Sequence, residues 1–353
     1  MNDHIEINNR CIGAGKPVYI IAEMSANHNQ NFDQAVKIIQ AAKDAGATAV
    51  KLQTYTPDTI TIDCNNKYFR LGKGTLWEGQ NLYELYNNAH TPWEWQPKLK
   101  KIANGIGLDL FSTPFDSSAV DFLEQMDVPA YKIASFEVVD LSLISRIAKT
   151  GKPIIMSAGM STLAEIEEAV QTIREAGNSQ LAVLKCTSAY PAPPDEINLL
   201  TIPNLERTFG VPVGLSDHTL DIAVPVAAVA LGACIVEKHL TLSRSISSPD
   251  CAFSLEPDEF KAMVEAIRTA EKALGEVKYG VTAGEIKSRV FRRSLFVVKD
   301  VHAGEVFTEE NLRSIRPGHG LSPRNLKDVL GRKAACEIPK GTPVNWDLLQ
   351  GEE

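Results

Sequence analysis

The sequence predicts an α/β protein in which a (β/α)₈ TIM barrel precedes a small C-terminal domain. Eight short β-branched apolar runs follow one another between residues 18 and 240. Segments of helical periodicity separate these runs, and the pattern changes after residue 270. Strands that alternate with helices form parallel sheets. Eight such units in about 260 residues match the usual size of a TIM barrel.

The strand-like runs are rich in Val, Ile and Leu, as expected for parallel strands that are buried on both faces. Each run ends in polar residues. The runs cover residues 18–25, 49–55, 109–115, 130–135, 153–159, 181–188, 212–218 and 234–240.

Helix-like stretches lie between the runs, for example at 32–45, 117–125, 163–175 and 221–231. Several follow a Ser, Thr or Asp that can cap a helix. A doubly wound open sheet is the alternative, but it would require G-x-G-x-x-G after the first strand. Residues 23–27 read Glu-Met-Ser-Ala-Asn instead, so we favour the barrel.

The segment between the second and third strands, roughly 56–92, is long and aromatic. It contains Trp77 and Tyr83 and runs into Trp93 and Trp95. Long insertions at the catalytic face of a barrel usually shape the substrate pocket. We expect the same here.

Short strands and turns replace the alternating pattern after a basic connector at 287–293. We therefore expect a catalytic domain at 1–280, a linker at 281–292 and a second domain at 293–353. The second domain is too small to hold a catalytic core alone.

Composition limits the possible partners and location. A net charge of −8 with dispersed Lys and Arg excludes nucleic acid and anionic membranes as main partners. The N-terminus lacks a signal peptide and no apolar run approaches the ~20 residues that span a bilayer, which predicts a cytoplasmic enzyme. The six cysteines form no C-x-x-C pair, so neither a zinc knuckle nor a disulfide framework is expected.

Polar residues concentrate where the predicted strands end, and these ends form the active-site face of a TIM barrel. The residues are Glu23, Lys51, Thr113, Lys132, Ser135, Ser157, Thr187, Ser188, Ser216, His218, Glu237 and His239. Together they predict a site for an anion and a metal.

His218 and His239 end the seventh and eighth runs, which neighbour each other at ~4.8 Å in a barrel. A lone histidine is more often a core or surface group, but two at adjacent strand ends favour a shared ion. Two neutral imidazoles completed by water suit Mn²⁺, with Mg²⁺ or Co²⁺ as alternatives. The open positions would accept a substrate oxygen.

Lys51 and Lys132 are the candidate anion-binding residues, because an ammonium neutralises phosphate and carboxylate charge while hydroxyls fix the oxygens. The hydroxyls come from Thr113, Ser135, Ser157 and Ser216. In the alternative view, the lysines face solvent at the strand ends. Glu23 is the leading carboxylate for acid or base chemistry, and its alternative role is to orient a ligand.

Eight motifs carry a resemblance to the sialic acid synthase family. They are IAEMSANHNQ (21–30), KLQTY (51–55), FSTPFD (111–116), YKIASFE (131–137), SAGM (157–160), KCTSAYPAP (185–193), GLSDHT (214–219) and EKHLT (237–241). The tail at 312–321 resembles the antifreeze-like (SAF) domain of those enzymes. Within the family, residues 22–30 and 77–95 look most like the pseudaminic acid synthase branch.

The resemblance implies manganese at His218 and His239, next to a phosphoenolpyruvate site. The implied phosphoenolpyruvate contacts are Lys51, Thr113, Lys132, Ser135, Ser157 and Ser216. Ser188 stands where the family has an asparagine that also contacts phosphoenolpyruvate, so its reach is shorter. Tyr190, Asp217 and Asp250 match pocket positions, with Asp250 a partner of the sugar.

Arg316 matches an SAF-domain arginine that enters the barrel of the partner subunit, which implies a domain-swapped homodimer. The implied reaction joins phosphoenolpyruvate to a 2,4-diacetamido-2,4,6-trideoxy-L-altrose and releases phosphate by C–O cleavage. Three alternatives stay open. These are N-acetylneuraminate or N,N'-diacetyllegionaminate synthesis, a metal-dependent aldolase, and a non-catalytic carbohydrate-binding barrel.

Overall fold

Eight parallel strands close into a barrel in the computed structural model, which describes residues 3–72 and 74–351. The strands pair in chain order and β10 pairs with β3, which closes the ring. They are β3 (Tyr19–Glu23), β4 (Ala49–Thr54), β5 (Asp109–Pro114), β6 (Tyr131–Ile133), β7 (Ile154–Ser157), β8 (Leu181–Cys186), β9 (Val213–Asp217) and β10 (Ile235–His239). The predicted barrel is confirmed.

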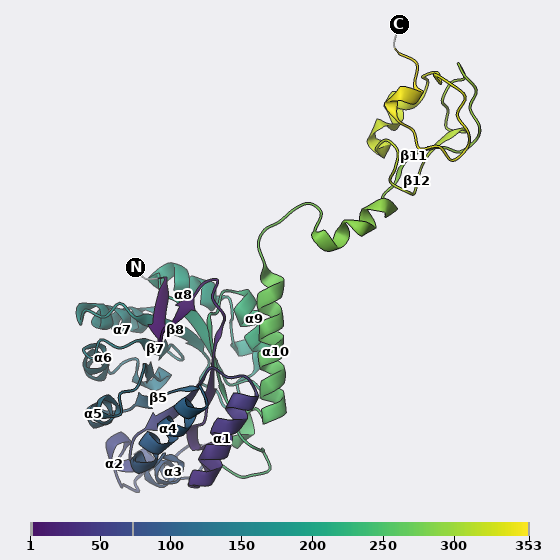
Figure 1. Cartoon of the computed structure of the whole chain (residues 1–353). Coiled ribbons are helices and arrows are strands. Elements are labelled where there is room, and N and C mark those ends of the chain that lie inside the picture. The colour runs from purple at the N-terminus through teal and green to yellow at the C-terminus, as the bar shows by residue number, and fades with distance from the viewer. Residues whose placement is uncertain (1–2, 73, 352–353) are drawn as a thin grey trace. The chain divides into compact units, whose positions relative to one another are not determined.

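Helices surround the strands (Figure 1), and each strand is followed by at least one. The main ones are α1 (Phe32–Asp44), α4 (Gln96–Gly105), α5 (Ser117–Gln125), α6 (Leu141–Ala148), α7 (Leu163–Glu175), α8 (Thr201–Phe209), α9 (Ala223–Ala230) and α10 (Pro257–Leu274). Several begin at the expected caps. Asp116 accepts from the Ala119 amide at α5, and Thr162 forms a capping box with Glu165 at α7.

An N-terminal hairpin that the sequence did not predict packs against the barrel at the start of its strands. It consists of β1 (His4–Ile7) and β2 (Arg10–Gly13), and it buries Ile5, Ile7 and Ile12. Asn8 Nδ2 lies 2.6 Å from Asp109 Oδ1, at the first residue of β5. The two strands are only four residues each, too short to give a clear alternating pattern.

The long insertion after β4 folds into α2 (Pro57–Ile60), η2 (Lys67–Phe69), α3 (Leu82–Ala89) and η3 (Trp93–Trp95). Figure 1 shows α2 and α3 at the end of the barrel away from the N-terminal hairpin. Its last part is tied to η1 (Ser25–His28), because His28 Nε2 lies 3.1 Å from Thr91 Oγ1. Gln30 Nε2 also donates to the His90 carbonyl at 2.6 Å. The insertion is therefore held beside the end of β3.

The chain divides into two compact units, Met1–Gly275 and Glu276–Glu353. The second contains η7 (Ala283–Glu285), η8 (Lys287–Phe291), β11 (Ser294–Val297), β12 (Leu312–Ile315), η9 (Pro323–Asn325), α11 (Leu326–Val329) and η10 (Trp346–Leu348). It has its own core around Leu295, Phe307 and Val344. Over the described residues, no helix is both long and apolar enough to cross a membrane.

Candidate active site

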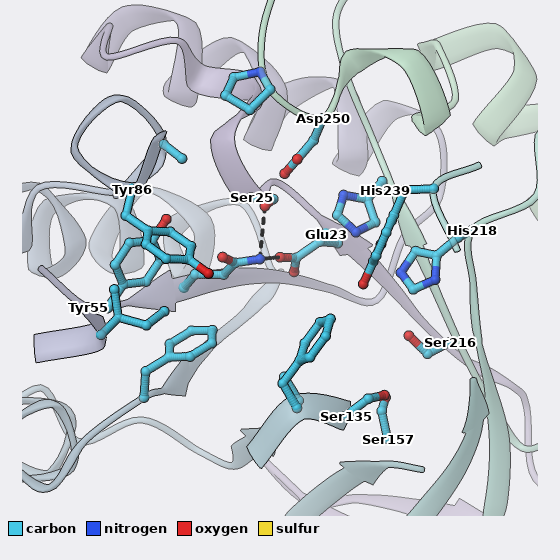
Figure 2. A pocket seen from close by; sticks show the side chains of 18 of the residues that line it. Glu23, Ser25, Tyr55, Tyr86, Ser135, Ser157, Ser216, His218, His239 and Asp250 are labelled. Atoms are coloured by element: carbon cyan, nitrogen blue, oxygen red, sulfur yellow. Dashed lines mark hydrogen bonds between the residues drawn. The ribbon is translucent and has the colours of Figure 1, made fainter. Parts of the chain in front are cut away.

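A cavity of about 590 Å³ lies at the C-terminal ends of the barrel strands. It gathers most of the predicted site residues, from strands that are distant in sequence (Figure 2). Those that line it are Glu23, Lys51, Lys132, Ser135, Ser157, Tyr190, Ser216, His218, Glu237, His239 and Asp250.

Five predicted residues do not line this cavity. Thr187 follows β8, and its Oγ1 accepts from Lys185 Nζ at 3.3 Å. Thr113 lies just behind it, with its Oγ1 3.4 Å from Lys51 Nζ. Ser188 contacts the cavity wall through Cys186, whose Sγ is 3.8 Å away. Asp217 points to the outside of the barrel and pairs with Lys238. Arg316 follows β12 in the second unit.

Lys51 holds two buried carboxylates at the floor of the cavity. Its Nζ is 3.2 Å from Glu23 Oε2 and 3.0 Å from Glu237 Oε1. Burial alone would lower the pKa of Lys51, but the two carboxylates outweigh it and raise the pKa. Burial raises the pKa of Glu23 to about 7, against the attraction of Lys51. Glu23 is thus poised to exchange a proton near neutral pH.

Lys132 provides a second cationic group in the cavity. Its Nζ donates to Ser157 Oγ at 2.6 Å and to the Ile133 carbonyl at 2.9 Å. Burial lowers the pKa of Lys132 to about 8. Burial would also raise the pKa of Glu237, but Lys132 and Lys51 lower it. Two lysines in one closed cavity provide the charge that a small dianion requires.

A glycine lets the loop after β7 approach the same region closely. A Cβ at Gly159 would lie 2.7 Å from Ser135 Oγ and 2.5 Å from Ser188 Oγ. The Gly159 amide donates to Ser135 Oγ at 3.0 Å. The loops that follow β6, β7 and β8 can therefore meet here only because residue 159 has no side chain.

The two histidines face one another across neighbouring strand ends, with ring centroids 5.4 Å apart. His218 Nδ1 is 2.9 Å from the Thr187 carbonyl, which assigns the proton to Nδ1 and leaves Nε2 as the lone-pair atom. His239 Nδ1 is buried without a hydrogen-bond partner among the described residues. Burial, together with His218, Lys51 and Lys238, lowers the pKa of His239 well below its usual value.

This imidazole pair fits a divalent metal as far as the donor set goes. A neutral imidazole with an unpartnered nitrogen is the form that binds a first-row ion. Within the described residues, no cluster of three or more His, Cys, Asp or Glu side chains has the arrangement of a metal site. Water or substrate oxygens would have to complete the coordination shell.

Asp250 and Tyr190 form the wall above the histidines. The Ala26 amide donates to Asp250 Oδ2 at 3.4 Å, and burial raises the pKa of Asp250. The Tyr190 ring stacks 4.5 Å from the His218 ring, centroid to centroid. Asp250 thus offers a carboxyl group to the cavity, and Tyr190 offers an aromatic face.

The sequence predicted Glu237 among the polar strand ends without giving it a role, and it did not predict Gln53 or Glu137. All three residues line the cavity. Gln53 Nε2 donates to Glu23 Oε1 at 3.0 Å and to Ser25 Oγ at 2.8 Å (Figure 2). Burial raises the pKa of Glu137 to about 7. Alternation along the strand could have found Gln53, which shares a face with Lys51.

Comparisons with known proteins agree over nearly the whole chain. Residues 38–279 match the NeuB family and residues 292–350 match the SAF domain. A pseudaminic acid synthase of Campylobacter jejuni is 48% identical over 335 residues, which cover 95% of this chain and 97% of that protein. An N,N'-diacetyllegionaminic acid synthase of Legionella pneumophila is 35% identical and covers 96% of each chain.

The fold also matches a solved structure of an N-acetylneuraminic acid synthetase from Leptospira borgpetersenii in complex with citrate. The TM-score is 0.73 at 31% sequence identity, and the match covers 82% of this chain and 95% of that one. The likeness therefore extends from sequence motifs to the barrel that positions the cavity.

Proposed function

The chain belongs to the NeuB family, and from this premise we propose that it is a pseudaminic acid synthase. It condenses phosphoenolpyruvate with 2,4-diacetamido-2,4,6-trideoxy-L-altrose and water, and releases pseudaminic acid and phosphate. The sequence resemblance to sialic acid synthases is confirmed by the family match. The choice of sugar follows the higher identity to a pseudaminic acid synthase, 48% against 35% for a diacetyllegionaminic acid synthase.

One observation gives the main support for the proposed type of reaction. Two buried lysines and two imidazoles line the same closed cavity, with Glu23 and Glu237 beside Lys51. A pure carbohydrate-binding protein has no need for two buried cations beside an unpartnered imidazole. An aldolase would release no phosphate from phosphoenolpyruvate, so phosphate release separates it from the proposed reaction.

His218 and His239 would hold a divalent metal, with Mn²⁺ as the proposed ion. When bound, the metal polarises the carbonyl oxygen of the aldehyde. The protein's own contribution is to present the two imidazoles, and His239 is held neutral because burial and nearby cationic groups lower its pKa. The hydrogen bond between His218 Nδ1 and the Thr187 carbonyl fixes the orientation of one of them.

Lys51 and Lys132 bind the phosphate and carboxylate groups of phosphoenolpyruvate, and the hydroxyls of Ser135, Ser157 and Ser216 orient them. The C3 carbon of phosphoenolpyruvate then forms a bond to the C1 aldehyde carbon, while the π electrons of the carbonyl move to its oxygen, which takes up a proton and becomes a hydroxyl. Positive charge develops at C2, where the buried carboxylates of Glu23 and Glu237 stabilise it. Both carboxylates are buried, which strengthens this interaction.

Water then adds at C2, and Glu23 accepts its proton, a role suited to a carboxyl group whose pKa is about 7. The resulting tetrahedral intermediate breaks the C2–O bond and expels phosphate, leaving a nine-carbon 2-keto acid. Lys132 and Lys51 stabilise the departing phosphate. We propose that this reaction takes place in the cytoplasm.

The test is release of inorganic phosphate from phosphoenolpyruvate in the presence of candidate sugars. The diacetamido-altrose should give the highest kcat/KM, above N-acetylmannosamine and the diacetamido sugar that yields legionaminic acid. Chelation of metal should abolish the signal and Mn²⁺ should restore it. Faster turnover of either competing sugar would reassign the substrate, and full activity after chelation would remove the metal from the site.

Arg316 completes the proposed site from a partner subunit in a domain-swapped homodimer, as the resemblance to the family implies. An inactive Arg316→Ala protein mixed with an inactive His239→Ala protein should regain part of the activity. The heterodimer would contain one intact barrel that receives an intact arginine. No recovery after subunit exchange would count against insertion in trans.

A further inference from the structure

The cavity has an apolar half that neither the lysines nor the imidazoles reach. It is built by the insertion after β4 and by the loops after β5 and β6. Its lining residues include Ile60, Leu82, Leu85, Tyr86, Phe115 and Phe136, with Tyr55 from the end of β4. A wall of this kind favours methyl groups over hydroxyls, because a hydroxyl placed there loses its hydrogen bonds to water.

Two tyrosines place hydroxyl groups in this half of the cavity, and one of them, Tyr86, lies near the buried carboxyl of Glu137. Tyr55 and Tyr86 pack edge to face at 5.6 Å, and Tyr55 packs against Phe115 at 5.2 Å, both between ring centroids. In the described part of the chain neither hydroxyl has a hydrogen-bond partner. Burial raises the pKa of both, so each remains a neutral donor and acceptor.

The nearby indole donor is already used, since Trp77 Nε1 donates to the Pro249 carbonyl at 3.1 Å. The two tyrosines therefore offer hydroxyls to a ligand in this half of the cavity. An acetamido group matches this surface, because its oxygen accepts a hydrogen bond while its methyl group needs an apolar wall.

The orientation of the sugar follows from the two ends of the cavity. In Figure 2, Tyr55 and Tyr86 lie across the cavity from His218 and Ser216, with Glu23 between them. An aldehyde carbon placed at the imidazoles directs the other end of an open-chain sugar toward the tyrosines. That end of the proposed substrate has an acetamido group at C4 and a methyl group at C6.

We propose that Tyr55, Tyr86 and the α3 residues Leu82 and Leu85 form a subsite that selects the 4-acetamido and 6-methyl groups of the sugar. This inference rests on the proposed function and assigns its sugar specificity to the insertion after β4. The Tyr86 hydroxyl binds the amide, and the leucines exclude a C6 hydroxyl.

The experiment compares three sugars by phosphate release: the diacetamido-trideoxy sugar, its 4-hydroxyl counterpart and its 6-hydroxyl counterpart. In Tyr86→Phe, kcat/KM for the first sugar should fall about 3- to 10-fold, the effect of one neutral hydrogen bond. The change should lie mainly in KM. The value for the 4-hydroxyl sugar should change less than about 2-fold.

Tyr83→Phe is the matched control, because Tyr83 lies on the same helix and directs its hydroxyl to Asp58, at 3.1 Å, outside the cavity. It should preserve the ratio between the sugars. Leu82→Asn supplies an independent test, and preference for the 6-methyl over the 6-hydroxyl sugar should shrink about 10-fold. Leu82→Asn also tests the proposed subsite by itself if Tyr86→Phe does not fold.

Unchanged selectivity in folded Tyr86→Phe and Leu82→Asn proteins would overturn the subsite while the proposed function stands. Absence of phosphate release by the wild-type enzyme with the diacetamido sugar is a separate result. It would overturn the proposed function, and the subsite with it.

Discussion

The two faces of β10 each contribute one residue to a buried lysine–carboxylate cluster, and the two clusters differ in how many of their polar atoms have hydrogen-bond partners. On the inner face, Glu237 joins Glu23 around Lys51. On the outer face, Lys238 pairs with Asp217 at 2.5 Å. Both clusters lie almost wholly out of contact with solvent. Because side chains alternate along β10, Glu237 points into the cavity and Lys238 points outward toward the helices.

The outer cluster uses its polar atoms within the protein. Lys238 Nζ donates to Asp217 and to the Thr219 carbonyl, and Asp217 accepts from the Thr219 amide at 3.0 Å and from its hydroxyl at 3.1 Å. These bonds fix the turn that follows His218. A buried ion pair is tolerated when its remaining hydrogen bonds are made, so this cluster is structural.

The inner cluster leaves atoms free. Among the described residues, the buried side-chain atoms without a hydrogen-bond partner are Glu23 Oε2, Glu137 Oε2, Glu237 Oε2 and His239 Nδ1, and the first of these still has an ion-pair contact with Lys51. All four belong to residues that line the cavity. Unsatisfied buried polar atoms cost stability and are rare in folded proteins. Their concentration in this cavity indicates that these atoms interact with a bound substrate.

The difference between the two clusters is tested best by replacing one carboxylate in each cluster with the amide of the same size. Glu23→Gln should lower kcat by about 10²- to 10⁴-fold, because the general base is lost. It should leave Tm unchanged or higher, because the variant removes a buried charge. Asp217→Asn is the matched change on the outer face and should lower Tm. A Tm loss in Glu23→Gln as large as that in Asp217→Asn would break the distinction.

Glu23→Gln and the wild-type protein should also differ in how their Tm depends on pH. Burial raises the pKa of Glu23 to about 7, so the native state holds a proton that the unfolded chain releases at lower pH. Wild-type stability is then lost as pH rises through this range. The Tm of Glu23→Gln minus that of wild type should therefore increase between about pH 4.5 and 7 and level off above it. A constant difference would contradict the raised pKa.

Much of the inner face could be predicted from the sequence, because eight strand ends in a barrel converge whatever the intervening loops do. Asp217 shows where a motif alone is insufficient. The resemblance suggests a pocket role, yet Ser216 and His218 face inward, so strand alternation already places Asp217 on the opposite face. The apolar half of the cavity was beyond prediction in detail. Its residues come from an insertion whose fold depends on long-range contacts, such as that between His28 and Thr91.

Lys238→Met tests the outer cluster directly and should give the smaller effect on chemistry. It leaves Asp217 buried without its cation, which costs about 3–5 kcal/mol in the free energy of unfolding. Adding Asp217→Leu should recover part of this loss, since a pair of apolar residues replaces the ion pair. Lys261→Met, at an exposed position on α10, is the control and should change little.

Turnover per folded Lys238→Met molecule should fall no more than about 10-fold, because Lys238 acts only through the turn that holds His218. Urea unfolding gives the stability, and phosphate release corrected for the folded fraction gives the turnover. A loss of turnover as large as that of Glu23→Gln, at full stability, would place Lys238 in the chemistry and erase the contrast between the two faces.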